Sequence, residues 1–547
     1  MANEVAAEKG FAGVEHLEIE SANDDTNGMA VMGTTKLNLD EILLVPAPSS
    51  DPRDPLNMPY WRKVVFVVLL SAFSSLGLSL VAGLGGLLGF YIPEYAAKGA
   101  TYADITALMT YPSMFMGIGN LICMPLALAV GRRSVYLASL IIMLVGGLLA
   151  AYSKSYEWHL GARMILGIAA GNSEALVPMM IQEIHFLHER STFLMWQSAM
   201  QLSITALYTM FASPIAGAIG PGNWYILGVG LAMVVFIASI FFVPESRYTR
   251  TLAAYGQTVE ATAEADLKHE QETKPMRISD RPALDFETYQ ARTLWSDMRL
   301  FVGPPDWSEG IYALRNTFQI LLFPNVFWAF CLNGLTLGIN IAIGTTYGSI
   351  VTAPPYSWSN NAASYVNASQ ILVSAVALPL LGNGSDFIIK WRARRNNGVH
   401  EPEARLILLV IPVVLGVLAA VLYGQAAQHP EDYHWFTIVF AYGAYIFCFI
   451  GCNIAAITWL LDSYPARSGP VLIVICALRG FISFGTSYGV SQFIEKAGHD
   501  GAFGAYAGLT ALFGLMGIPM FIWGKNIRAF TGRWAIKERS GKPSMSH

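Results

Sequence analysis

Two ionisable residues, Arg163 and Glu174, lie inside one long apolar stretch of the sequence, residues 158–181. A charged side chain at membrane depth costs roughly 3 kcal/mol or more unless it faces a partner or water, so it indicates a functional site. The two residues are eleven positions apart, close to three helical turns, which predicts one shared helix face and a separation of about 16 Å along the axis. We therefore expect a cation and an anion at two depths of a water-lined path.

Glu174 and Arg479 are the two charges for which the residue type leaves several roles open. A carboxylate such as Glu174 can exchange a proton, attract a cationic substrate, or do both in turn, and coupling follows if proton and substrate compete for it. Its alternative role is that of a structural partner for a Ser, Asn or Arg of a neighbouring helix. Arg479, in another apolar run, anchors an anionic substrate, neutralises Glu174, or is a static packing residue.

Polar side chains occur on several other apolar runs and predict a central cavity for a small-molecule substrate. Any one of them is more often a hydrogen bond between helices than a ligand contact. The residues that we select for the cavity are Gln201, Asn340, Tyr445 and Asn453.

The composition identifies the class of protein. Of the 547 residues, 54% are hydrophobic and 13% are charged, whereas a soluble protein has about 25% charged residues. The apolar residues form long runs separated by short polar turns, which predicts a polytopic protein of the lipid bilayer. No basic run indicates nucleic acid. All five cysteines lie in apolar runs, so we expect neither disulfides nor a metal site, and no catalytic or ATP-binding motif indicates an enzyme, a cofactor or a primary pump.

The apolar runs form two sets of six, separated by a polar stretch. Such a duplication is typical of transporters built from two parallel six-helix halves. We therefore expect an all-α membrane protein with 12 transmembrane helices. The expected segments are an N-terminal tail (1–60), a first half (61–244), a linker (245–317), a second half (318–524) and a C-terminal tail (525–547).

Basic residues of the short loops predict the orientation. They gather on the side of the N-terminus and the linker, as Arg132, Arg133 and Arg190 do in the first half. Cytoplasmic loops carry an excess of Lys and Arg. We expect a multi-pass protein of the cell membrane with both tails and the linker in the cytoplasm.

Two segments carry a family resemblance. Residues 51–63, DPRDPLNMPYWRK, are similar to the DPxxPLNWPxWRK lead-in of fungal drug:proton antiporters with twelve helices, with Met58 where Trp is usual. Residues 243–248, VPESRY, are similar to their PET-type ending. The sequence thus resembles the major facilitator superfamily and, within it, this antiporter type. The resemblance implies the major facilitator fold and proton-coupled transport.

The loop between the second and third helices departs from the superfamily pattern G-x-x-x-D-R-x-G-R-R/K. Gly131, Arg132 and Arg133 are retained, but Leu128 and Ala129 occupy the Asp and Arg places, so the acidic half of the charge relay is absent from this loop. In the second half, Gly382-Asn-Gly-Ser-Asp386 keeps the G-x-x-x-D spacing. We expect Arg132, Arg133 and Asp386 to gate the cytoplasmic side, and the alternative for Asp386 is a solvated helix cap.

Three further sites follow from motifs. Arg163 begins a segment, residues 163–171, that is closely similar to the family's R-x-x-q-G-x-g-a-a motif, in which the arginine modulates a carboxylate or binds an anion. Ser213-Pro-Ile-Ala-Gly217 resembles a degenerate antiporter motif, and Pro214 predicts a bend that helps gating. Asn367 begins an N-glycosylation sequon near the outer end of the eighth helix.

These observations predict a monomeric, proton-coupled secondary transporter that works by alternating access. We expect export of small organic molecules, such as drugs or secondary metabolites. The alternative is proton-coupled uptake of a cationic nutrient such as a polyamine, with Glu174 as the partner of the cation. A transporter-like sensor is a rival from another class, but the linker has no recognisable signalling module.

Overall fold

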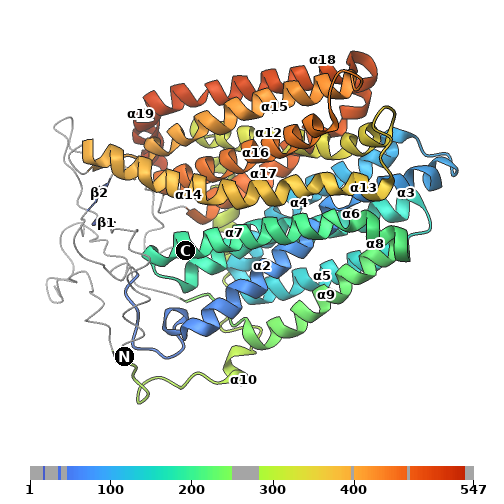
Figure 1. Ribbon diagram of the computed structural model, residues 1–547. Helices are drawn as coiled ribbons and strands as arrows, with labels where there is room; N and C mark the ends of the chain where they lie inside the picture. Colours follow the sequence, from blue (N-terminus) through green and yellow to red (C-terminus); the bar gives the residue numbers. More distant parts are fainter. Residues whose placement is uncertain are drawn as a thin grey trace, which may run out of the picture.

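The computed structural model describes residues 17–18, 35–37, 46–248, 283–395, 399–464 and 468–535. Its long elements are α-helices (Figure 1). Over the described residues, eleven helical segments are long and apolar enough to cross a membrane, and twelve if the bent pair 192–210 and 212–219 is one span. The expected all-α fold with twelve spans is therefore confirmed.

The first half contains eight helices over the described residues because two of its spans are interrupted. The first span breaks at Gly83, and the fifth bends by 40° near Phe211. After a short 3-10 turn, Pro55–Asn57, the helices are α2 (Tyr60–Ala82), α3 (Leu84–Ala96), α4 (Tyr102–Val130), α5 (Arg132–Ala151), α6 (Tyr156–Ile184), α7 (Leu187–Met210), α8 (Ala212–Ile219) and α9 (Pro221–Phe242).

The second half repeats this order after the linker. Short helical turns open its second and third spans, a helical kink lies at Gly498, and its last span is interrupted at Met516. The elements are α12 (Pro324–Thr352), α13 (Asn360–Ala363), η4 (Ser364–Asn367), α14 (Ala368–Arg395), η5 (Pro402–Leu409), α15 (Val410–Gln428), α16 (Trp435–Ser463), α17 (Ser468–Tyr488), α18 (Val490–Leu515) and α19 (Gly517–Ala535).

The linker contributes α10 (Leu294–Asp297) and α11 (Trp307–Ile320). Helix α11 packs against α4 of the first half and α17 of the second. Its position is held by an ion pair of 3.0 Å between Arg247 and Glu309. Three short antiparallel strands, β1 (Leu17–Glu18), β2 (Thr35–Leu37) and β3 (Val399–His400), pair in the order β1-β2-β3.

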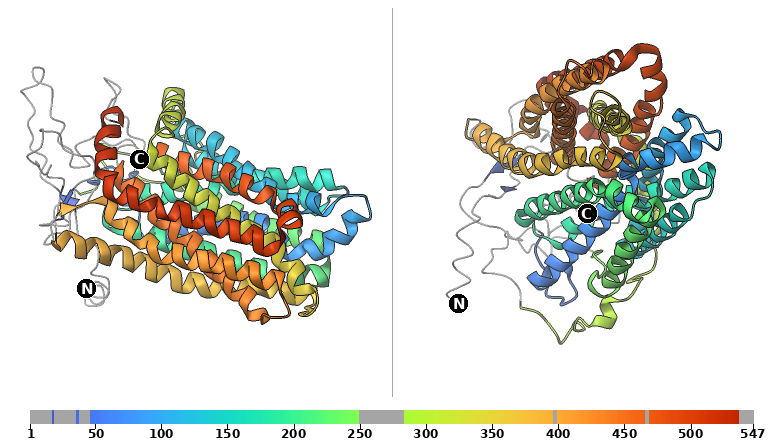
Figure 2. Two further views of the ribbon diagram at one scale, coloured as in Figure 1. Left: turned by 90° about the horizontal axis from the view of Figure 1, so that it is seen from above. Right: turned by 45° about the vertical axis from the view of Figure 1, so that its right-hand side comes forward.

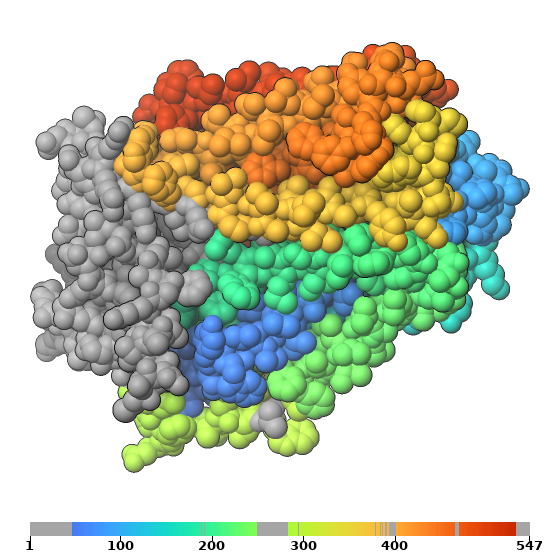
Figure 3. Space-filling model, in the orientation of Figure 1, coloured from blue at the N-terminus to red at the C-terminus, as the bar shows by residue number. Residues whose placement is uncertain are grey.

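The two halves lie side by side, with their helices roughly parallel (Figures 1 and 2). Helix α4 packs against α17, and α7 packs against α14. The α7–α14 contact follows the boundary between the green and yellow surfaces in Figure 3. The α4–α17 contact depends on small residues. A Cβ added to Gly480 would lie 2.6 Å from the carbonyl oxygen of Ser113, so the backbones approach too closely for a larger residue.

The molecule has two ends. The linker end is the one at which α11 packs and at which α5 and α19 have their ion pairs. The distal end is the opposite one, where α3, α8 and α13 meet. Buried residues of α2–α9, joined by Ala313 of α11 and by Ile473 and Cys476 of α17, form one apolar core, and buried residues mainly of the second half form two more.

Candidate functional site

Glu174 and Arg479 meet at the boundary between the two halves. Glu174 is on α6, Arg479 is on α17, and Nη2 of Arg479 donates a hydrogen bond to Oε2 of Glu174 within an ion pair. Their side chains are 13% and 3% exposed, respectively. The sequence leaves several roles open for Arg479, and in the structure it pairs with Glu174. The pair joins helices from different halves.

The remaining donors of Arg479 are poorly satisfied. Its Nη1 donates to Oδ1 of Asn453 over 3.4 Å, which is long for a hydrogen bond. Its Nε is buried and has no hydrogen-bond partner among the described residues. Guanidinium groups carry five N–H donors in a fork that matches a carboxylate. The site therefore has more donors than acceptors.

Two amide side chains of α12 also have buried polar atoms without partners among the described residues. Asn333 is fully buried, and neither its Oδ1 nor its Nδ2 has a partner within the described part of the chain. The Oδ1 of Asn340, seven residues later and on the same helix face, is unpartnered too. Helix α12 packs closely against α17, the helix of Arg479. Buried polar atoms without partners are rare in folded proteins, so these atoms indicate a place for a polar ligand.

Arg163 has a different environment, and the expected shared path with Glu174 is wrong. Its side chain is fully buried inside the first half. The guanidinium donates to the carbonyl oxygens of Leu108 at 2.7 Å, Leu80 at 3.2 Å and Val81 at 2.5 Å. It also donates to the hydroxyl of Tyr225 at 2.9 Å.

The break between α2 and α3 explains this position of Arg163. The last carbonyl groups of a helix have no partner within it. Leu80 and Val81 precede the break at Gly83, so Arg163 supplies the donors that their carbonyl oxygens lack. Helices α2, α4 and α9 supply all of these partners of Arg163.

A histidine that the sequence analysis missed extends the Arg163 cluster. His159 is fully buried, and its two ring nitrogens lie 3.0 Å from the hydroxyl of Tyr95 and 3.1 Å from the hydroxyl of Tyr225. The position one turn before Arg163 on α6 is the signal that could have indicated it. The cluster ties α3, α6 and α9 together.

Two other expected cavity residues have partners away from the Glu174–Arg479 pair. Tyr445 is fully buried, and its hydroxyl forms a hydrogen bond of 3.1 Å with the Oγ1 of Thr510 on α18. Gln201 is half-buried on α7, and its Oε1 accepts a hydrogen bond of 2.7 Å from Gln197. Asn453 alone of the expected amides contacts Arg479 among the hydrogen bonds of the described residues.

The basic residues at the linker end are paired within the first half. Arg132 forms an ion pair of 2.9 Å with Glu183, at the end of α6. The carboxylate of Glu245 accepts from the backbone N–H groups of Arg132 at 3.0 Å and Arg133 at 3.2 Å, and Arg133 donates to the carbonyl of Ile240 at 2.7 Å. The acids missing from the loop are thus supplied by Glu183 and Glu245.

Glu245 lies in the VPESRY segment, so its signal was visible in the sequence, whereas Glu183 had no motif to mark it. In the second half the corresponding end is held by Arg528 and Glu403, which form two hydrogen bonds of 2.7 and 2.8 Å. Asp386 is on α14, but its side chain lies outside the described part of the structure.

The degenerate antiporter motif joins the halves at the distal end. Because Pro214 has no N–H, the carbonyl of Met210 lacks its helical donor. The hydroxyl of Ser364, from the second half, donates to that carbonyl at 2.8 Å. Ser213 donates to the carbonyl of Asn360 at 2.7 Å. These bonds cross between the halves and close the distal end.

The Asn367 side chain, at the expected glycosylation sequon, has partners within the protein. The residue is 5% exposed at the start of the eighth span. Its Nδ2, the atom that would carry the sugar, donates to the hydroxyl of Tyr347 and to the carbonyl of Ser364, each at 3.0 Å.

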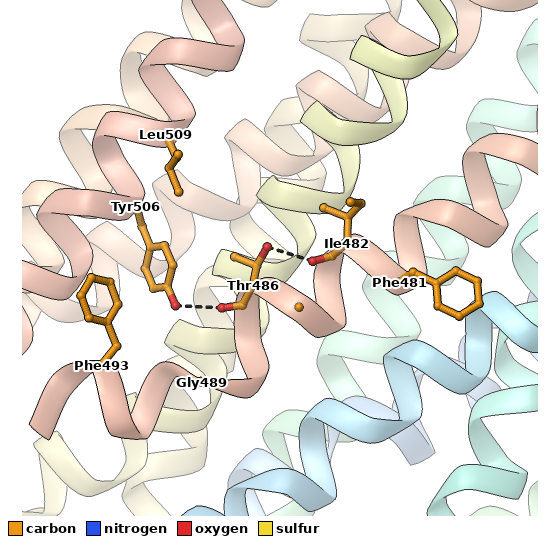
Figure 4. Close-up of a pocket in the computed structure, with 8 residues that line it drawn as sticks. Phe481, Ile482, Thr486, Gly489, Phe493, Tyr506 and Leu509 are labelled. Atoms are coloured by element: carbon orange, nitrogen blue, oxygen red, sulfur yellow. Dashed lines mark hydrogen bonds between the residues drawn. The ribbon is translucent and has the colours of Figure 1, made fainter. Parts of the chain in front are cut away.

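A groove of about 520 Å³ lies between α17 and α18 (Figure 4). Its lining is mostly apolar and includes Phe481, Thr486, Phe493 and Leu509, and Tyr506 donates across it to the carbonyl of Thr486 at 2.8 Å. Neither Glu174 nor Arg479 lines it. It is separate from the site described above.

Comparisons with known proteins agree with this architecture. A family model described as Major Facilitator Superfamily matches residues 65–472. An uncharacterized MFS-type transporter of Schizosaccharomyces pombe is 23% identical over 90% of this chain and 89% of its own length. Protein HOL1 of Saccharomyces cerevisiae is 22% identical over 95% of this chain and 96% of its own. The xylose transporter XylE of E. coli, in a partially occluded inward-open conformation, shares the fold with a TM-score of 0.53 and 13% identity, over 88% of this chain and 99% of XylE.

Proposed function

This chain belongs to the Major Facilitator Superfamily, and we propose that it is a proton-coupled transporter of small organic molecules that works by alternating access around the Glu174–Arg479 pair. One observation carries the proposal. A largely buried carboxylate and a buried guanidinium, contributed by different halves of the molecule, neutralise each other at the boundary that has to rearrange.

The physical reason for proton coupling lies in how this pair can separate. Alternating access rocks one half against the other around a central site. Moving α6 relative to α17 breaks the pair and leaves two buried charges without partners, which is strongly unfavourable. Glutamate can lose its charge by taking up a proton, whereas arginine stays charged. Protonation of Glu174 therefore lowers the cost of separation and biases the equilibrium between the two open states.

Contacts at the two ends fit different parts of this cycle. At the distal end, the Ser213–Asn360 and Ser364–Met210 hydrogen bonds hold the halves together, and the bend before Pro214 is the proposed hinge. At the linker end, Arg132–Glu183 and Arg528–Glu403 each stay within one half, so they keep its helix ends together while it rotates. Asp386 remains our proposed latch of the cytoplasmic gate.

The direction of transport has two candidates. The family resemblance and the motif around Pro214 favour export by exchange with protons, with drugs or secondary metabolites as substrates. Uptake together with protons is favoured by one observation, the neutralisation of Glu174 by Arg479. When the carboxylate takes up a proton, the arginine becomes free to hold a substrate. In both candidates the chain lies in the cell membrane with its linker end on the cytoplasmic side. It acts as a monomer.

The test uses the purified full-length chain in proteoliposomes with an imposed pH gradient and a library of small organic compounds, analysed by mass spectrometry. The wild type should accumulate or extrude at least one compound only while the gradient is present, and Glu174→Gln should abolish this response. Glu403→Gln is the matched control because it changes the same residue type in a buried pair within one half. A gradient-dependent response that survives Glu174→Gln would contradict the proposal.

A further inference from the structure

We infer that the substrate is a small organic monoanion, which Arg479 binds while Glu174 carries the proton. The inference rests on the proposed proton-coupled function and names the substrate class of the same site. It follows from the pairing of Glu174 with Arg479, the unused donors of Arg479 and the charge balance that results.

Arg479 has more N–H donors than the protein has acceptors for them. One carboxylate oxygen of Glu174 and one long contact with Asn453 are the partners of this side chain, and its Nε has none among the described residues. An anionic group with two oxygens can accept two parallel hydrogen bonds from a guanidinium, and these bonds are stronger than neutral ones. An incoming carboxylate would therefore use donors that the protein itself leaves free.

The charge balance of the site favours a monoanion over a cation. In the empty site, Glu174 and Arg479 sum to zero. With a proton on Glu174 and a monoanion on Arg479, the sum is again zero, so the loaded site crosses the bilayer without a net charge. A cation on the ionised Glu174 would displace Arg479 and leave a net charge of plus one in a low-dielectric interior, which is expensive.

An uncharged substrate fails for another reason. It does not compete with either partner, so the ion pair can stay intact and no proton has to bind. A monoanion, in contrast, competes with the Glu174 carboxylate for Arg479, and protonation of that carboxylate is what releases the arginine. Proton and anion thus bind together and travel in the same direction.

The α12 amides give the remainder of the anion polar contacts. Asn333 has both an unused donor and an unused acceptor, and Asn340 has an unused acceptor on the same helix face. Because α12 packs against the helix of Arg479, these groups suit an anion that also carries an uncharged polar group, such as a hydroxyl or an amide.

The experiment uses the full-length chain in proteoliposomes, acidic outside, with an equimolar library of monocarboxylates, primary amines and uncharged polar compounds. The wild type should concentrate one or more monocarboxylates, and Arg479→Gln should abolish this accumulation. Arg479→Lys, which keeps the charge but loses the fork, should retain a reduced fraction. Glu174→Gln should lose gradient-driven accumulation but keep anion exchange without a gradient, because glutamine resembles the protonated carboxyl. Size-exclusion profiles control for folding.

A membrane potential set with valinomycin and potassium provides the second readout, and it should leave the initial rate unchanged because the loaded site is neutral. Accumulation of amines or uncharged compounds that depends on Arg479 would overturn the inference while leaving proton-coupled transport in place. A rate that follows the potential would also overturn it. If no compound responds to the gradient in the wild type, the proposed function itself fails.

Discussion

Two buried arginines, one in each half, lie inside apolar helices and have opposite kinds of surroundings. Arg163 donates to three carbonyl groups and one hydroxyl of its own half. Arg479 depends on a carboxylate from the other half and has a donor left over. A charge whose partners move with it stabilises the fold, whereas a charge whose partner moves away from it responds to protons and ligands. The difference lies in the partners, because the residue type is the same and both side chains are buried.

The same contrast separates two glutamates. Glu403 holds Arg528 through two hydrogen bonds within the second half, at the linker end. Glu174 holds Arg479 across the boundary between halves. Rotation of the halves preserves the first pair and breaks the second.

The largest expected effect on transport comes from replacing Glu174 rather than Glu403. Glu174→Gln should reduce gradient-driven transport to the level of empty liposomes, because the proton-accepting group is lost. Glu403→Gln should lower the melting temperature, since removing one partner of a buried pair costs about 3–5 kcal/mol. It should leave the ratio of gradient-driven transport to exchange unchanged. Transport by both variants and thermal unfolding in detergent check this. Equal losses of coupling would remove the distinction between the two pairs.

Arg163 provides the next test. Arg163→Ala should destabilise the chain strongly, because each buried carbonyl left unpaired costs roughly 1–3 kcal/mol. Arg163→Lys should be less harmful, since an ammonium group can still serve some of these carbonyls. Thermal unfolding measures the stability, and transport is normalised to folded protein. If Arg163→Lys abolished coupling without changing the melting temperature, the arginine would act on the transport site after all.

Asn453→Ala should have a moderate effect. The residue accepts one long hydrogen bond from Arg479, and loss of such a bond costs about 0.5–1.5 kcal/mol, a roughly two- to ten-fold change in apparent affinity. The half-saturating substrate concentration should rise while the maximal rate stays near the wild-type value. A fall in the maximal rate alone would mean that Asn453 helps the halves to move.

The smallest effect is expected at the distal end. Ser364→Ala removes the donor to the Met210 carbonyl and should favour distal opening by about 1 kcal/mol, a roughly five-fold population shift. A reporter cysteine in a cysteine-free background, Ala212→Cys, should then react faster with a membrane-impermeant maleimide. An unchanged labelling rate would show that this hydrogen bond does not hold the distal end closed.

Hydropathy and motifs were enough to predict the fold. Long apolar runs specify helices that span a bilayer, and the family match confirms the superfamily resemblance, whereas the drug:proton antiporter type stays a prediction. Glu174 and Arg479 were identified because charges in apolar runs are unusual. Their pairing was one alternative among several, since residues 305 positions apart meet only through packing between the halves.

The errors have physical causes as well. Helical spacing places Arg163 and Glu174 on one face but does not reveal which neighbouring helices cover each end of that face. Tyr445 and Asn367 bond to neighbouring helices, which the sequence does not show because a polar group in a span can bond to a helix as readily as to a ligand or a sugar. Glu183 serves Arg132 from another helix end, a contact that loop motifs cannot show.

The most direct test of the central claim is a double-mutant cycle of Glu174→Gln and Arg479→Gln, with the free energy of unfolding measured as a function of pH. We expect a coupling free energy of about 1–3 kcal/mol near neutral pH. It should disappear in acid, because a protonated Glu174 no longer attracts the arginine. A coupling that persists unchanged in acid, or that is absent at neutral pH, would contradict a proton-released pair between the two halves.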